Sequence, residues 1–246
     1  GVQYGPNVDD PEGVFSHGTH VAGTIAAADN DYGVIGVAPE AKLCLVKVLF
    51  NSGSGSFEDV AAGIVWAADQ AVDVINMSLG GNFEEACPVS LNSIFEDLAA
   101  MGIYTVVSAG NDSSPADVYF PANCPGVITV GATGPTALRA SYSNFGPFVD
   151  VMAPGGDAYV NDPDGNSLDA ILSTVEDNDY GFMQGTSMAS PHVAGIVSLM
   201  LAQDPTLTLS QVRQRLHNAS VPLTLGECGA PTLGLDGLNL CGAGLL

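Results

Sequence analysis

The stretch Gly185-Thr-Ser-Met-Ala-Ser-Pro-His-Val-Ala-Gly195 places one serine, Ser187, between a Gly-Thr turn and a long apolar run. A glycine followed by a hydroxyl residue is typical of a helix start, so we expect Ser187 at or just before a helix N-terminus. Free N–H groups and the positive end of the helix dipole can stabilise an anion there. Ser187 is therefore a candidate nucleophile beside an oxyanion site. Pro191 conflicts with the carbonyl of Ser187 and predicts a distorted first turn.

Two further stretches offer partners for that serine. Ser16-His-Gly-Thr-His-Val-Ala-Gly-Thr-Ile-Ala-Ala27 supplies histidine, which is the usual base for a serine nucleophile. Val107-Ser-Ala-Gly-Asn-Asp112 supplies an amide side chain in a glycine turn after an apolar strand. The chain thus holds a hydroxyl, an imidazole and an amide, each in a distinctive local context.

The segments HGTHVAG, SAGN and GTSMASPHVAG, in that order, resemble the subtilisin-like serine proteases (subtilases, peptidase family S8). The resemblance covers nearly the whole chain, and eleven consecutive residues around a serine are far more specific than a lone GxSxG. It implies a serine endopeptidase without an organic cofactor. By resemblance, Ser187 attacks the peptide carbonyl, His17 is the general base, and Asn111 with the Ser187 N–H holds the oxyanion.

Each of these residues also has a purely structural interpretation. Ser187 would otherwise be a helix N-cap, His17 a capping histidine, and Asn111 a turn residue. His20 shares a helix face with His17, but no third metal ligand follows at a plausible spacing. We therefore interpret His20, and likewise His192, as packing residues.

The resemblance also implies a substrate-binding strand and a calcium loop. Peptide substrates would pair in extended form with Ser78, Leu79 and Gly80, and the pocket for the residue before the scissile bond would be lined by Ser108, Ala109 and Gly110. The alternative for the two glycines is simple turn punctuation. The proposed calcium ligands are the Asn30 side chain and the carbonyls of Ala28, Tyr32 and Val34. A solvated acidic loop is the alternative there.

The third triad member of the family, an aspartate in an Asp-(Ser/Thr)-Gly motif, has no match in the 16 residues before His17. Asp9 and Asp10 are the only aspartates among those residues; they lie in a predicted loop and are candidate substitutes for the acid. We expect a single catalytic domain over residues 1–246, incomplete at both ends, with the acid on an upstream segment of the same precursor, which would also carry a propeptide. Two alternative functions remain. One is a catalytically impaired peptide-binding module on the same scaffold, and the other is an esterase, which would need the chain order Ser…acid…His.

The five cysteines predict two disulfides and one free thiol. Cys87 and Cys124 share a loop-like, proline-flanked context, and Cys228 and Cys241 bracket a glycine-rich segment, so we pair them accordingly. Cys44 lies in an apolar run and is predicted to be a buried thiol. Such bridges imply a secreted or extracytoplasmic location, whereas five reduced thiols would fit a cytosolic enzyme.

The charge is strongly acidic, with 27 Asp and Glu against five Lys and Arg, a formal net charge of -22. This charge argues against nucleic acid or an anionic membrane as a partner, and no stretch is apolar for long enough to span a membrane. We expect a monomer that acts on proteins or peptides. The acidity fits either adaptation to salt or an ordinary acidic secreted protein.

Alternating helices and strands predict an α/β protein, a three-layer α/β/α sandwich with a largely parallel sheet. Active groups should gather at the carboxyl ends of its strands. The expected helices are 17–28, 57–70, 89–101, 187–203 and 209–219. The expected strands are 42–49, 73–78, 103–108, 127–132, 148–152 and 171–175.

Overall fold

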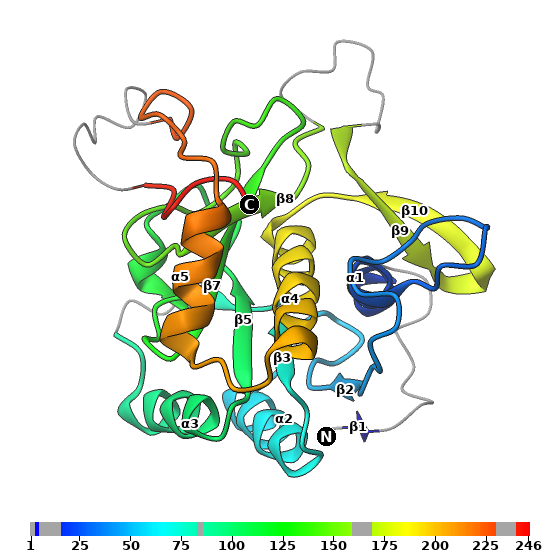
Figure 1. Ribbon diagram of the computed structural model, residues 1–246, viewed down its shortest axis with the longest axis vertical. Coiled ribbons are helices and arrows are strands. Elements are labelled where there is room, and N and C mark those ends of the chain that lie inside the picture. Colours follow the sequence, from blue (N-terminus) through cyan, green and yellow to red (C-terminus); the bar gives the residue numbers. More distant parts are fainter. Residues whose placement is uncertain (1–2, 5–15, 83–85, 159–168, 230–239) are drawn as a thin grey trace.

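The computed structural model describes residues 3–4, 16–82, 86–158, 169–229 and 240–246. Its centre is a four-stranded parallel sheet in the order β3-β5-β7-β8 (Figure 1). The strands are β3 (Val74–Met77), β5 (Tyr104–Ser108), β7 (Val127–Thr133) and β8 (Val151–Pro154). Every residue of β5 and β7 is buried, which explains why their sequences are nearly continuous apolar runs.

Helices cover both faces of this sheet. One face packs against α4 (Thr186–Gln203) and α5 (Leu209–Ala219), and the other against α2 (Phe57–Asp69) and α3 (Val89–Ala100). Val106 belongs to the core under α4, whereas the next residue, Val107, belongs to the core under α3. Successive strand residues point to opposite faces, so one strand serves both cores. The three-layer α/β/α architecture is confirmed.

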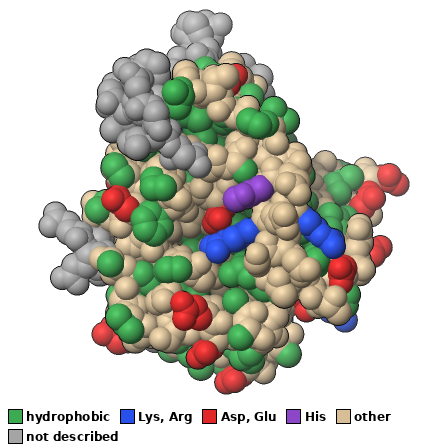
Figure 2. Space-filling view, turned by 60° about the vertical axis from the view of Figure 1, so that its left-hand side comes forward, with side chains coloured by type: hydrophobic (Ala, Val, Ile, Leu, Met, Phe, Trp, Pro, Cys, Tyr) green, Lys and Arg blue, Asp and Glu red, His purple; other side chains and the backbone are tan. Residues whose placement is uncertain are grey.

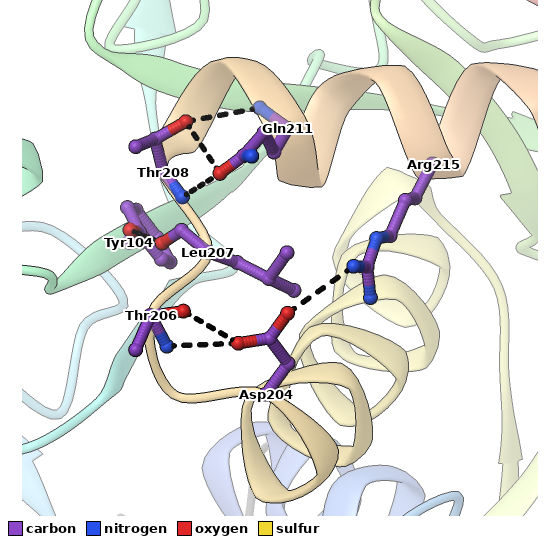
Figure 3. A network of polar contacts seen from close by, with 7 residues as sticks. All are labelled: Tyr104, Asp204, Thr206, Leu207, Thr208, Gln211 and Arg215. Carbon is purple, nitrogen blue, oxygen red and sulfur yellow. Dashed lines mark hydrogen bonds and ion pairs between the residues drawn. The ribbon is translucent and has the colours of Figure 1, made fainter.

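The turn from α4 to α5 is fixed by the polar network in Figure 3. Asp204 accepts hydrogen bonds from the backbone N–H and the hydroxyl of Thr206, and it forms an ion pair with Arg215. Thr208 and Gln211 form a reciprocal capping box that starts α5. The Tyr104 hydroxyl donates to the carbonyl of residue 207, which ties this turn to β5. Helix α5 is thereby held against the same face of the central sheet as α4.

The five predicted helices are all present, with ends that differ by at most two residues. The first, α1 (His17–Ala26), packs against α4 and stops two residues earlier than expected. Within the described residues, no helix has both the length and the apolar character needed to cross a membrane.

The predicted strand 42–49 is wrong in extent and in environment. Only β2 (Val46–Lys47) forms, and it pairs antiparallel with β1 (Gln3–Tyr4) outside the central sheet. Leu43 is 46% exposed, and Cys44, predicted to be a buried thiol, is an exposed free thiol. Within the described residues α2 packs against β2, but no strand of the central sheet pairs with this segment, so it stays exposed or partly exposed.

The predicted strand 171–175 forms as β9 (Ile171–Val175), but it belongs to a hairpin instead of the central sheet. It pairs antiparallel with β10 (Asp179–Met183), which the sequence analysis did not identify. A second small ladder joins β4 (Gly81–Asn82) to β6 (Tyr119–Phe120). The predicted strand 148–152 appears slightly later, as β8.

Both predicted disulfides are present. Cys87, just before α3, is bonded to Cys124, and Cys228 is bonded to Cys241 near the end of the chain. Cys124 belongs to the core under α3, with Cys87 packed against it, whereas Cys228 and Cys241 both belong to a third buried cluster. Asp9 and Asp10, the candidate substitute acids, lie outside the described residues.

Candidate active site

Ser187 is the second residue of α4, after the N-cap Gly185. Its N–H lies in the first turn, where backbone amides have no acceptor within the helix. Although Pro191 lies in the helix, α4 runs without interruption to Gln203. Proline cannot donate to the carbonyl of Ser187, and the hydroxyl of Ser78 donates to that carbonyl instead, at 2.8 Å. A side chain from the sheet thus replaces the missing helical hydrogen bond.

The hydroxyl of Ser78 is itself held by a short polar chain. The Asn76 amide nitrogen donates to the Ser78 hydroxyl oxygen at 3.0 Å, and the buried Ser190 hydroxyl donates to the Asn76 amide oxygen at 2.5 Å. The Ser187 hydroxyl lies 3.4 Å from the carbonyl of Ser78. These contacts fix the turn that carries Ser187 against the carboxyl end of β3. From the sequence, Ser78 was expected only to bind substrate, and Ser190 had no expected role.

Asn111 follows β5 and is oriented by Thr186. Its amide oxygen accepts from the Thr186 N–H and from the Thr186 hydroxyl, both at 2.9 Å. A Cβ placed on Gly185 would lie 3.6 Å from the Asn111 amide nitrogen and 3.6 Å from the Ser187 backbone nitrogen. The two donors therefore border the same small space, which exists because residue 185 is a glycine. This arrangement can stabilise a negatively charged oxygen.

Two buried residues that the sequence analysis missed support this turn. Thr186 also accepts a hydrogen bond from the Gly110 N–H, at 3.2 Å. Asn144 donates to the carbonyl of Ala109 and accepts from the backbone N–H groups of Asp112 and Ser114. No local sequence pattern indicates the contacts of Asn144, because this residue lies in a loop far along the chain from residues 108–114. Together they set the position of the Asn111 side chain.

His17 is the first residue of α1 and is half-buried. It lines a groove of about 880 Å³ that also includes Asn76, Ser78, Leu79 and Gly80. His17 and Ser78 line the same groove, and the Ser78 hydroxyl contacts the carbonyl of Ser187. The other wall of the groove is the segment 43–50. Among the described strands of the central sheet, β3 is at the edge, and this edge borders the groove.

His20 packs beneath the β9–β10 hairpin and is fully buried, at 0% exposure. Its Nε2 lies 2.9 Å from the carbonyl of Ile171 and 3.2 Å from that of Gly181, while no described residue hydrogen bonds Nδ1. Burial lowers the pKa of His20, although the two carbonyls partly oppose this effect. Burial also lowers the pKa of His192, whose Nδ1 lies 2.8 Å from the carbonyl of Met188. Both histidines contact backbone carbonyls in buried or half-buried surroundings, as expected of packing residues.

We expect the buried His20 to make the folded state sensitive to acid. Because its folded pKa is lowered, the unfolded chain binds this proton first as the pH falls below about 6.5, so the unfolding free energy should drop. His20→Gln should flatten that drop in urea denaturation curves measured between about pH 5 and pH 8. His217→Gln, a change at an exposed position on α5, is the control and should keep the slope of the parent. An equal slope in parent and His20→Gln would contradict the expectation.

The two proposed walls of the substrate pocket follow neighbouring strands. Ser78, Leu79 and Gly80 come directly after β3, and the segment 108–110 begins at the last residue of β5. These strands pair in parallel, so both segments lie at the carboxyl edge of the sheet.

The proposed calcium loop is exposed and contains residues 28–34. The Asn30 amide oxygen accepts from the Tyr32 N–H at 3.2 Å, and the Tyr32 side chain is 74% exposed. The described residues contain no group of three or more His, Cys, Asp or Glu side chains that could hold a metal. A cation here would therefore depend on carbonyl and amide oxygens, which suit calcium.

Comparison with known proteins shows which family the chain belongs to. A model of the subtilase family matches residues 2–244. The chain is 44% identical to subtilisin DY of Bacillus licheniformis over 84% of its own length and 71% of that protein. It is 42% identical to subtilisin NAT of Bacillus subtilis subsp. natto over 91% of its length, and it spans about half of that relative, 55%.

The chain belongs to the subtilase family. This is a family of serine endopeptidases, so the proposed class of chemistry agrees with the relatives. Solved structures agree as well: a protease from Pseudoalteromonas arctica superposes with a TM-score of 0.78 at 35% identity, covering 94% of this chain and 68% of that one. A cold-adapted subtilisin-like serine proteinase gives a TM-score of 0.71 at 36% identity, covering 84% of this chain and 68% of that one. The subtilisin-like fold is therefore confirmed.

Proposed function

We propose that this subtilase hydrolyses peptide bonds of proteins through an acyl-enzyme on Ser187. The Ser187 oxygen attacks the peptide carbonyl while His17 takes the hydroxyl proton, and His17 then gives that proton to the leaving amine. A water molecule, deprotonated by His17, releases the acyl group as a carboxylic acid. The observation that carries the proposal is the convergence of the Asn111 amide nitrogen and the Ser187 N–H beside Gly185.

The substrate peptide binds in extended form at the carboxyl edge of the sheet. It adds a strand next to residues 78–80 through main-chain hydrogen bonds, and its side chain before the scissile bond lies between residues 78–80 and 108–110. The adjacency of β3 and β5 supports this arrangement.

The groove beside His17 accepts a strand that carries the third catalytic group. Its walls are the edge of β3 and the apolar segment 43–50, where Leu43 and Leu45 are exposed. An extended segment there would pair with β3, cover these leucines and bring a carboxylate beside His17. By family resemblance that segment is the upstream Asp-(Ser/Thr)-Gly strand of the same precursor, which would orient the imidazole.

A fluorophosphonate reagent tests the proposed function. Such reagents modify only activated serines, so we expect one label per chain, located on Ser187 by peptide mass mapping, together with cleavage of casein. His17→Ala should abolish both signals, whereas His217→Gln should retain them. Peptide binding without labelling would instead establish the catalytically impaired binding module. The labelling is measured with and without a synthetic Asp-(Ser/Thr)-Gly peptide, and an increase with the peptide would support the groove assignment.

The exposed loop 28–34 binds a structural calcium ion through the Asn30 amide oxygen and the carbonyls of Ala28, Tyr32 and Val34. Oxygen donors of this kind suit Ca²⁺, although these four alone fall short of its usual six to eight ligands. We expect millimolar CaCl₂ to raise the thermal midpoint relative to EGTA, and Asn30→Ala to abolish that increase. The exposed Asn218 on α5 provides the control Asn218→Ala. An equal calcium effect in all three proteins would place the ion elsewhere.

The protein works outside the cytoplasm as a monomer. The two disulfides support this location, because disulfides persist in oxidising compartments. The net charge of -22 supports the monomer, because strong like charge keeps copies of the chain apart. Figure 2 shows one face of the molecule on which the acidic side chains are scattered instead of gathered into one cluster. Such a surface also disfavours nucleic acid and anionic membranes as partners.

A further inference from the structure

The ring of Tyr119 lies against two glycines on opposite walls of the proposed substrate pocket. A Cβ on Gly80 would overlap the Cε1 atom of Tyr119 and lie 3.2 Å from its Cδ1. A Cβ on Gly110 would lie 2.8 Å from Cε2 and 2.9 Å from Cδ1 of the same ring. One aromatic ring therefore occupies the space that both glycines leave open. Gly110 additionally has a φ of 102°, which side chains rarely adopt.

The backbone around Tyr119 fixes the ring in this place. Tyr119 begins β6, which pairs antiparallel with β4, and its partner in the ladder is Asn82. Because β4 starts immediately after Gly80, this pairing holds β6 against the wall that contains Gly80. The carbonyl of Phe120 lies 2.6 Å from the position of a Gly80 Cβ, so the two backbones are in close contact. The ring is thus attached to the wall by a strand pair instead of extending from a free loop.

Tyr119 is partly buried and packs against the core under α3. Burial raises the pKa of the Tyr119 hydroxyl, with a smaller contribution from the negative charge of Asp112. On the side of Gly110, the buried side chain of Asn144 contacts the same region and is held by its own hydrogen bonds to the 109–114 turn. Tyr119 also lines the groove that contains Ser78 and Leu79. The ring therefore contacts both walls of the proposed pocket and also borders the groove.

We propose that Tyr119 fills the pocket for the residue before the scissile bond and restricts that residue to glycine, alanine or serine. This inference rests on the proposed function, which places that side chain between residues 78–80 and 108–110. A phenylalanine or leucine side chain needs the volume that the Tyr119 ring already occupies. An aromatic side chain buries on the order of 150–250 Å² and would have to share the space between Gly80 and Gly110 with the ring.

The test compares two peptide anilides that differ only in alanine or phenylalanine before the cleaved bond. The parent enzyme should have the higher kcat/KM for alanine. Tyr119→Ala should raise the phenylalanine-to-alanine ratio of kcat/KM by at least about tenfold, as expected when a hydrophobic pocket gains several methylene equivalents of space. Both substrates are measured on the same preparation, so a partly unfolded variant does not change the ratio. An unchanged ratio in Tyr119→Ala, or a parent that prefers phenylalanine, would overturn the proposal.

A matched control removes a tyrosine ring elsewhere. Tyr180 lies on the β9–β10 hairpin, where its ring packs against Tyr32 with centroids 6.2 Å apart, outside the groove. Tyr180→Ala makes the same chemical change and should keep the substrate ratio of the parent. A shift of the ratio equal to that of Tyr119→Ala would overturn the assignment to Tyr119.

A binding measurement separates this inference from the proposed function. In Ser187→Ala, the affinities of the two cleavage products that end in alanine or phenylalanine are measured by calorimetry, and Ser187→Ala/Tyr119→Ala is measured in parallel. The alanine product should bind more tightly to the first protein, and the preference should reverse in the second. If no peptide is hydrolysed and Ser187 stays unlabelled, the proposed function fails, yet this pair of affinities still decides whether Tyr119 fills the pocket. An identical preference in both proteins would overturn the inference alone.

Discussion

With the acid of the proposed upstream segment in place, replacing Ser187 with alanine should lower kcat for peptide hydrolysis by about 10⁶-fold, the loss known for the nucleophile of a subtilisin, a member of the same family. No acyl-enzyme can form without the hydroxyl, and neither His17 nor the oxyanion donors can replace it. KM should change little, because the residues that hold the peptide, 78–80 and 108–110, stay in place. Steady-state kinetics on a peptide anilide and fluorophosphonate labelling provide the two measurements.

The structure provides a sharp control for this expectation. Ser93 lies on the exposed side of α3, and its hydroxyl donates to the carbonyl of Val89 within the same helix. Ser93→Ala removes the same atom far from the groove and should leave kcat unchanged. The neighbouring Ser78 provides a second comparison, because its hydroxyl reaches the Ser187 carbonyl. If Ser187→Ala retained activity that only Ser78→Ala abolished, Ser78 would be the nucleophile and the assignment would be wrong.

Asn111→Asp should lower kcat by at least the 10²–10³-fold known for loss of the corresponding donor in a subtilisin. The aspartate oxygen can still accept the two hydrogen bonds from Thr186, so the turn keeps its anchor. The amide donor is lost, and a negative charge replaces it beside the space where the oxyanion would form. The effect should therefore appear in kcat, with KM much less affected.

Asn111→Leu completes the test, because leucine lacks both the donor and the acceptor for Thr186. We expect it to lose activity like Asn111→Asp and also to lower the unfolding midpoint. Asn218→Asp on α5 makes the same amide-to-carboxylate change at an exposed helical surface and should leave kcat unaltered. A normal kcat in Asn111→Asp would show that Asn111 is only a turn residue, the structural interpretation that its sequence context also allows.

The helices could be predicted from the sequence because their signals are local. Apolar spacing, the capping box of Thr208 and Gln211, and the Gly-Thr-Ser start of α4 all lie within a few residues of the element that they define. The strands of the central sheet were equally visible, since burial on both faces gives continuous apolar runs. The segment 42–49 carries the same signal but stays largely exposed, because burial depends on neighbours that an apolar run does not specify.

The sequence by itself pointed to the chemistry proposed for this protein: by family resemblance the motifs give a hydroxyl, an imidazole and an amide their expected roles, and the cysteine contexts predicted both disulfides. Tertiary structure alone decided which groups converge. The order and register of β3, β5 and β7 bring Asn111 to Gly185, Ser78 to the carbonyl freed by Pro191, and the Tyr119 ring between two glycines. The physical reason is that local propensities act over a few residues, whereas these contacts join residues that meet only after the sheet has formed.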